Sequence, residues 1–301
     1  MSMKLTLKIV KGVLATLVVV VVLFAVFVYV QSERRLRKTY AVQAAKVHIP
    51  NDSASVARGA HLYKSMISCA LCHGADAGGK VYSDMPKVAT VAGPNLTRGE
   101  GGVGATLADS DWVRAIRHGV RRDGTSLIVM PSEVYVHLSS DDLGAIIAYL
   151  KQVAPVNRVV PPTKFGPMGR ALLAAGKMNI LVAPKTPAFR DVARVPPGPT
   201  AEYGNYIADA SGCHGCHGFG LSGGRVAGPS SFPPASNLTV AGIGDWTEDD
   251  FVRAMREGKR KNGTTIDDFM PWKGFSGMTD EELHALWLHL RSMPPRQYGN
   301  K

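Results

Sequence analysis

A five-residue pattern, Cys-x-x-Cys-His, occurs twice in the chain, at residues 69–73 and 213–217. It is the attachment signature of c-type haem, in which two thiols add across the porphyrin vinyl groups and the adjacent histidine reaches the iron on the proximal side. Two copies predict two covalently bound haem c groups. The predicted attachment residues are Cys69, Cys72, Cys213 and Cys216, and the predicted proximal iron ligands are His73 and His217.

Two other kinds of site use paired cysteines, namely zinc sites and redox dithiols. A zinc site would require the two motifs to converge, although they are separated by about one domain length. A redox dithiol does not require a histidine directly after its second cysteine, and here that histidine occurs in both copies. The chain has four cysteines, all within the motifs, so none is left for a disulfide. Haem attachment is therefore favoured.

The N-terminal segment is long and apolar. Residues 12–32 include no charged residue, and residues 13–30 are almost wholly apolar. As a helix rising 1.5 Å per residue, this run covers about 30 Å, enough to cross the hydrocarbon layer of a membrane. A cleaved signal peptide has a shorter apolar region that ends at small residues. We therefore expect a retained anchor over residues 1–32, followed by a tether over residues 33–52.

Charge does not set the orientation of this span. Three lysines precede it, and Arg34, Arg35, Arg37 and Lys38 follow it, so the positive-inside rule gives no decision. In bacteria, however, c-type haem is attached outside the cytoplasmic membrane. This property of the class predicts a protein of the bacterial inner membrane with one N-terminal span and its haem domains in the periplasm.

The rest of the chain is an internal duplication. Residues 95–97 and 237–239 both read Asn-Leu-Thr, and residues 111–117 resemble residues 250–256. Each copy closes with an amphipathic helix whose leucines and other apolar residues recur at i, i+3, i+4 and i+7. Ser139 and Thr279 are predicted to cap these closing helices, and Thr200 and either Ser53 or Ser55 to cap the first helix of each copy.

These patterns predict a mainly α fold made of an N-terminal transmembrane helix and two tandem helical domains. Pro-rich residues between the copies are expected to form an extended connector packed over both domains, with one short helix near residues 168–177. The predicted limits are 53–153 for domain 1, 154–198 for the connector, 199–295 for domain 2 and 296–301 for a C-terminal tail.

A Met-Pro pair follows each haem motif at a similar distance and precedes the closing helix. Methionine opposite histidine fills the coordination sphere of a haem iron and raises its reduction potential. Most methionines are core residues, but Met130 and Met270 recur at matched positions and are the predicted distal ligands. His118 and His137 are conceivable rivals in the first copy, but the second copy has Glu257 opposite His118.

The order of haem motif, Asn-Leu-Thr, short helix, Met-Pro and closing helix resembles class I cytochromes c over residues 53–295. The tandem arrangement is most similar to membrane-bound cytochrome c subunits of bacterial alcohol, sugar-acid and aldehyde dehydrogenases. These subunits often carry three haem domains and a C-terminal anchor, unlike this chain. The resemblance implies that the carbonyl of Pro94 accepts a hydrogen bond from the proximal histidine, with Ser236 at the matching position.

The resemblance implies an electron-transfer protein, with no substrate chemistry of its own. Its partners would be a dehydrogenase subunit, an oxidase or another cytochrome, and the membrane through the N-terminal helix. The alternative is a peroxidase-like enzyme with two haems, one of them open, but the matched Met-Pro sites argue against it. The net charge of +11 comes with no nucleic-acid-binding module. Basic clusters at residues 117–122 and 256–261 are candidates for docking an acidic partner.

Overall fold

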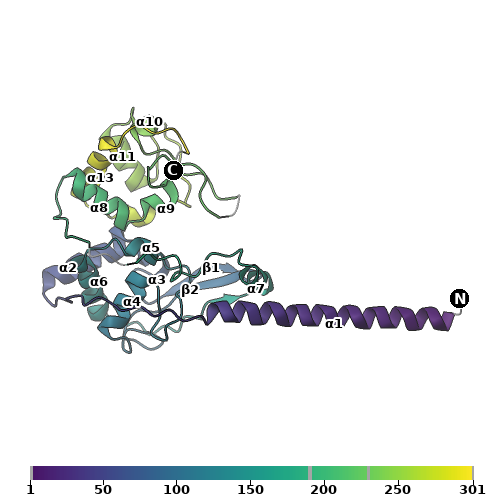
Figure 1. Cartoon of the computed structure of the whole chain (residues 1–301). Coiled ribbons are helices and arrows are strands. Elements are labelled where there is room, and N and C mark those ends of the chain that lie inside the picture. Colours follow the sequence, from purple (N-terminus) through teal and green to yellow (C-terminus); the bar gives the residue numbers. More distant parts are fainter. Residues whose placement is uncertain (1–2, 189–191, 229–230, 300–301) are drawn as a thin grey trace.

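The computed structural model describes residues 3–188, 192–228 and 231–299. The predicted mainly α architecture is confirmed: a long N-terminal helix leads into two helical domains joined by the connector (Figure 1). Both domains lie at one end of this helix, which projects away from them.

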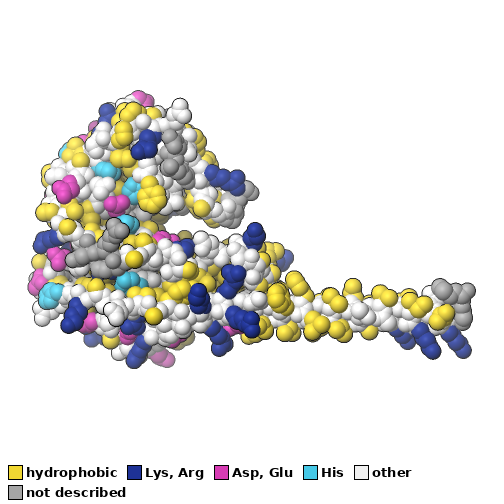
Figure 2. Space-filling model, viewed as in Figure 1, with side chains coloured by type: hydrophobic (Ala, Val, Ile, Leu, Met, Phe, Trp, Pro, Cys, Tyr) yellow, Lys and Arg dark blue, Asp and Glu magenta, His cyan; other side chains and the backbone are white. Residues whose placement is uncertain are grey.

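The N-terminal helix, α1 (Met3–Leu36), carries an apolar surface that is exposed along its length (Figure 2). It is long and apolar enough to cross a membrane. The helix continues four residues past the predicted boundary at residue 32, because its last turns pack against another helix, α7 (Pro167–Ala174). Arg170 of α7 donates to Ser32 Oγ at 3.0 Å and to Glu33 Oε1 at 2.9 Å.

The segment after α1 lies against domain 1 and is not a free tether. Tyr40 N donates to the carbonyl of Gly124 at 2.8 Å, and Val47 and Ile49 pack against the hydrophobic core. Residues 37–52 therefore fix the path from α1 to the first domain. In the same way the C-terminal segment packs on domain 2, where Gly299 N donates to the carbonyl of Ser222 at 3.1 Å.

The two domains repeat one helical plan. In each, the first helix crosses the closing helix, and the short helices lie between them in the sequence. Domain 1 contains α2 (Ser53–His61), a π-helical turn η1 (Leu62–Met66), α3 (Ala70–His73), α4 (Asp109–His118), α5 (Ser132–Tyr135) and α6 (Ser140–Gln152). Domain 2 contains α8 (Ala201–Ala210), α9 (Cys213–His217), α10 (Val240–Ile243), α11 (Glu248–Glu257), α12 (Trp272–Phe275) and α13 (Asp280–Ser292).

Side-chain caps determine where these helices begin. The hydroxyls of Ser139, Thr200 and Thr279 accept hydrogen bonds from backbone N–H groups in the first turns of α6, α8 and α13, as predicted. The predicted cap of α2, Ser53 or Ser55, is wrong. The cap is Asp52, whose carboxylate accepts from Ser55 N at 2.9 Å. A carboxylate also complements the positive end of a helix.

A small antiparallel sheet, which was not predicted, lies beside domain 1. Its strands are β1 (Lys80–Met85), β2 (Ala89–Gly93) and β3 (Lys164–Phe165), in that order. The third strand belongs to the Pro-rich connector, and α7 follows it directly, close to the predicted short helix. Further along the connector, Val182 is buried against domain 1, and Val192 and Val195 pack against the hydrophobic core.

Candidate haem-binding sites

Each Cys-x-x-Cys-His motif forms a short helical turn, α3 or α9. In domain 2 it follows the first helix α8 closely, and in domain 1 the π-helical turn η1 lies between α2 and α3. In domain 2 the predicted residues come together around one cavity of about 730 Å³. Cys213, Cys216, His217 and Met270 all line it. This volume lies in the range of about 300–1,000 Å³ that is usual for small-molecule and cofactor sites.

Apolar side chains form most of the remaining wall of this cavity, including Trp246, Phe251, Leu286 and Leu290. They keep water away from a bound porphyrin while two thiols, an imidazole and a thioether reach the cavity together. This donor set fits haem c. In domain 1, the equivalent residues Cys69 and Met130 are half-buried and pack against the hydrophobic core.

Both histidines that the sequence predicts as proximal ligands are oriented by a backbone carbonyl. His73 Nδ1 lies 3.0 Å from the carbonyl oxygen of Pro94, and His217 Nδ1 lies 2.7 Å from that of Ser236. The hydrogen bonds implied by the family resemblance are thus confirmed. When Nδ1 donates to a carbonyl, Nε2 carries the free lone pair that a metal requires.

The repeated Asn-Leu-Thr segment supports this carbonyl. Asn95 Oδ1 accepts from Thr97 N at 2.9 Å, and its amide donates to the carbonyl of Val156 at 2.7 Å. In domain 2, Asn237 makes the corresponding bonds to Thr239 N and to the carbonyl of Arg296. The asparagines therefore hold the loop next to each motif histidine against the segment that follows the closing helix.

The Met-Pro pairs share one backbone conformation. Pro131 and Pro271 have φ/ψ of −84°/57° and −79°/44°, and each preceding methionine carbonyl accepts from the residue after the proline, at 2.9 and 2.8 Å. This is an inverse γ-turn, for which proline already has the required φ. A short helix, α5 or α12, follows at once, so the repeated proline fixes how the chain leaves each methionine.

Burial controls the ionisation of the side chains in these motifs. It raises the pKa of both Cys69 and Cys213 to about 12, so both free thiols are neutral. Burial also lowers the pKa of His73 and favours the neutral imidazole. Among the residues that the structure describes, no group of three or more His, Cys, Asp or Glu side chains could hold a metal ion.

The suggested basic docking clusters contain residues with structural roles. Arg117 is fully buried, and its Nη2 donates to the carbonyl of Leu138 at 2.9 Å. Its counterpart Arg256 pairs with Asp280 at 2.7 Å, at the start of α13. Both arginines therefore hold the entry to a closing helix, and Arg117 cannot belong to a docking surface. The charge pattern of the sequence did not distinguish them from surface cations.

Comparison with known proteins agrees with this geometry. Residues 54–150 match the family model of cytochrome c oxidase, cbb3-type, subunit III, and residues 201–294 match the model of cytochrome c. The cytochrome c subunit of the quinone alcohol dehydrogenase of Gluconacetobacter polyoxogenes is 28% identical over 273 residues, covering 81% of this chain and 57% of that protein.

Two further relatives are also named as cytochrome subunits of dehydrogenases. The fructose dehydrogenase cytochrome subunit of Gluconobacter japonicus is 27% identical and covers 84% of this chain and 54% of its own length. The gluconate 2-dehydrogenase cytochrome c subunit of Pantoea cypripedii is 35% identical over 107 residues, covering 33% of this chain and 24% of that subunit. The chain thus spans about half the length of the relatives that it matches most fully.

The two matched segments contain the two attachment motifs and both Met-Pro pairs, in the same order. Each motif implies one covalently bound haem c. The chain therefore contains two cytochrome c domains and is homologous to cytochrome c subunits of bacterial dehydrogenases.

Proposed function

We propose that the chain is a membrane-tethered dihaem cytochrome c that relays electrons between a dehydrogenase or respiratory complex and a downstream acceptor. The observation that carries this proposal is the cavity of domain 2, where His217 and Met270 line one space together with both thiols. An iron bound by both side chains has no open position for substrate, which favours electron transfer over catalysis.

In this proposal the chain holds each haem through four side chains. Cys69, Cys72, Cys213 and Cys216 carry the thioether bonds, His73 and His217 are the proximal ligands, and Met130 and Met270 the distal ones. The haem supplies a one-electron iron couple. The protein contributes orientation through the Pro94 and Ser236 carbonyls, exclusion of water by the apolar walls, and a neutral sulfur ligand that favours ferrous iron.

We further propose that α1 is a retained anchor in the inner membrane and that both domains lie on the periplasmic side. The packing of α1 supports retention, since Arg170 bonds to Ser32 and Glu33 and its guanidinium lies 4.6 Å from the centre of the Tyr29 ring. Haem attachment supports the periplasmic side, because bacteria form these bonds there. Tethering raises the effective concentration of the domains near membrane-bound partners.

The names of the relatives support a dehydrogenase as electron donor. Alcohol, gluconate and fructose dehydrogenases act on different substrates, so the names favour a class of partner and not one substrate. The relatives that match over most of this chain are about one and a half times its length.

Mass and absorption spectra test the proposal. We expect the mature polypeptide to carry the added mass of two haems, and the oxidised protein to show the Met–iron charge-transfer band with no high-spin component. Replacing Met130 or Met270 by Ala should lower the potential of one haem, leave it attached and remove about half of that band, because each methionine would serve one iron. A high-spin iron in the unsubstituted protein, or unchanged potentials in both variants, would contradict the proposal.

A further inference from the structure

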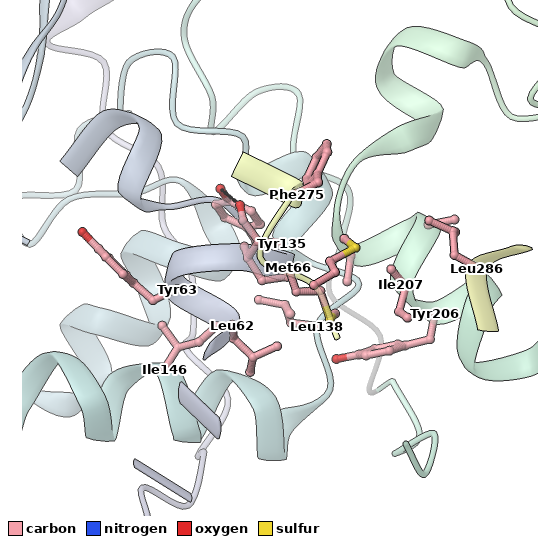
Figure 3. Packing of buried hydrophobic residues seen from close by; sticks show 14 of the residues in the cluster. Leu62, Tyr63, Met66, Tyr135, Leu138, Ile146, Tyr206, Ile207, Phe275 and Leu286 are labelled. Carbon is pink, nitrogen blue, oxygen red and sulfur yellow. Dashed lines mark hydrogen bonds between the residues drawn. The ribbon is translucent and has the colours of Figure 1, made fainter. Parts of the chain in front are cut away.

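The two domains share one hydrophobic core. Figure 3 shows Leu62 and Met66 of domain 1 beside Ile207 and Tyr206 of domain 2, and all belong to a single cluster of buried residues. None of these four side chains is more than 4% exposed. Domains joined only by a flexible connector would each cover their own apolar surface, so this shared cluster indicates a permanent contact.

A buried carboxylate of domain 2 is paired with two side chains of domain 1. Glu282 has a side-chain exposure of 4%, and its Oε1 accepts from Arg58 Nη1 at 3.1 Å. Its Oε2 lies 2.7 Å from His61 Nε2. Arg58 also pairs with Asp142 of its own domain at 3.1 Å. A displacement that broke these pairs would leave an uncompensated buried charge, which is costly.

The internal repeat provides a second contact of the same kind. Asp142 and Glu282 are both the third residue of a closing helix, α6 or α13. Across the interface Tyr206 donates its hydroxyl hydrogen to Asp142 Oδ2 at 2.6 Å. Tyr206 follows Gly204 of α8 by two residues, as His61 follows Gly59 of α2. Equivalent positions of the two copies thus meet equivalent partners, as in an isologous dimer.

This arrangement also brings the haem motifs to the interface. Gly274 of α12, close to the Met-Pro of domain 2, lies against Ser68, the residue directly before the first motif, and against Leu71 within the motif. A Cβ on Gly274 would be 2.6 Å from Ser68 Oγ. Reciprocally, a Cβ on Gly212, just before the second motif, would be 3.2 Å from Val134 of α5. Each attachment motif therefore borders the methionine segment of the other domain.

We propose that the cross-domain pairs Glu282 with Arg58 and His61, and Asp142 with Tyr206, position the two haem-binding motifs as one rigid pair. The inference rests on the proposed function in that both motifs carry haem. It goes further, because it makes the chain a single two-centre unit with a fixed separation between the centres. The alternative is two independent carriers that move on the connector.

The test uses the full, haem-loaded chain in detergent and circular dichroism in the Soret band. Two haems held close in a fixed geometry give an exciton couplet, which depends on their mutual orientation. We expect this couplet in the unsubstituted protein and its loss in the double variant Arg58→Met with Tyr206→Phe. Calorimetry should change in parallel, from one unfolding transition to two. Asp141→Asn is the matched control, since Asp141 is next to Asp142 in α6 but is 64% exposed.

The readouts separate this inference from the proposed function. Loss of the couplet with haem content and the Met–iron band unchanged would show that only the relative position of the domains has changed. An unchanged couplet in the double variant, or no couplet in the unsubstituted protein, would overturn the inference while leaving electron transfer intact. If the double variant fails to accumulate, the single variant Tyr206→Phe becomes the deciding test, because it removes only one hydroxyl from the interface. It should weaken the couplet.

Discussion

Two glycines determine how closely the long helices of each domain approach. Gly59 of α2 faces the backbone of α6, where an added Cβ would lie 1.9 Å from the carbonyl oxygen of Ala145. Gly204 of α8 faces α13 in the same way, at 2.0 Å from the carbonyl oxygen of Ala285. The haem motif follows each of these helices closely, so the crossing also sets the position of the attachment cysteines.

A methyl group at the first crossing should separate the helices. We expect Gly59→Ala to destabilise the protein by about 2 kcal/mol or more, because the backbone carbonyl cannot move aside as a side chain could. The measurement is the midpoint of thermal unfolding of the haem-loaded chain. Gly198→Ala is the control, since an added Cβ there has no atom within 4 Å. Equal midpoints for the two variants would show that the crossing has enough space for a larger residue.

At the scale of elements, backbone hydrogen bonds in the described part of the chain join the connector to the Met-Pro loop of domain 1 and not to that of domain 2. Ile128 forms a bridge with Leu181, and Val129 N donates to the carbonyl of Ile180 at 2.9 Å. Val129 has a φ of +67°, which is unfavourable for a β-branched residue. The connector thus holds a strained residue directly before Met130, and the two haem sites differ in how their methionine loops are supported.

The hydroxyl of Ser126 is central to this support, since it accepts from both Val182 N and Ala183 N, at 2.8 and 2.9 Å. Ser126→Ala would leave the half-buried N–H of Ala183 without its acceptor, at about 1–3 kcal/mol, whereas Val182 N would keep only its bond of 3.1 Å to the carbonyl of Leu127. We expect the Met–iron band of the first haem to disappear at a lower temperature than in the unsubstituted protein. Thr265→Ala is the matched control, because the exposed Thr265 has the equivalent position in domain 2 and accepts only from Lys259 Nζ among the side-chain bonds described, at 2.7 Å.

In the Ser126→Ala variant, the band of the second haem should persist to its normal temperature. Equal loss of both bands would mean that Ser126 supports the fold in general and not the Met130 loop. The two bands can be assigned by repeating the measurement with Met270→Ala, in which only the first haem should contribute.

The elements differ in how far the sequence predicts them. Caps and closing helices depend on neighbouring residues, so Ser139 and Thr279 were predicted correctly from spacing alone. Strand β3 pairs with β2 more than 70 residues earlier in the chain, and no local pattern indicates such a partner. The proximal hydrogen bonds were implied by family resemblance, whereas the cross-domain role of Arg58 and Glu282 depends on which faces of the domains meet. The three-dimensional packing shows which faces meet, whereas the internal repeat of the sequence does not.

At the scale of the whole molecule, the interface contains a carboxylate whose protonation is linked to stability. Burial by itself raises the pKa of Glu282. The hydrogen bond and charge of His61, the hydrogen bond from the Thr279 backbone and the charge of Arg58 together outweigh burial, so the net pKa lies below the usual 4.5. Because the unfolded chain binds this proton more readily, Glu282 stabilises the fold above about pH 4.5. This contribution is lost as the pH falls through the lowered pKa.

Acid should therefore open the interface in a way that depends on Glu282. Between about pH 5 and about pH 3, we expect the unfolding midpoint of the unsubstituted chain to fall more steeply than that of the Glu282→Gln variant. The variant has no proton to gain at this position. Glutamine keeps an oxygen that can accept from Thr279 N, a bond of 3.0 Å in the structure, so the cap of α13 is retained. The Soret couplet should disappear over the same pH interval. Identical pH profiles for the two proteins would show that the stability of the interface comes from its apolar core and not from the buried ion pair.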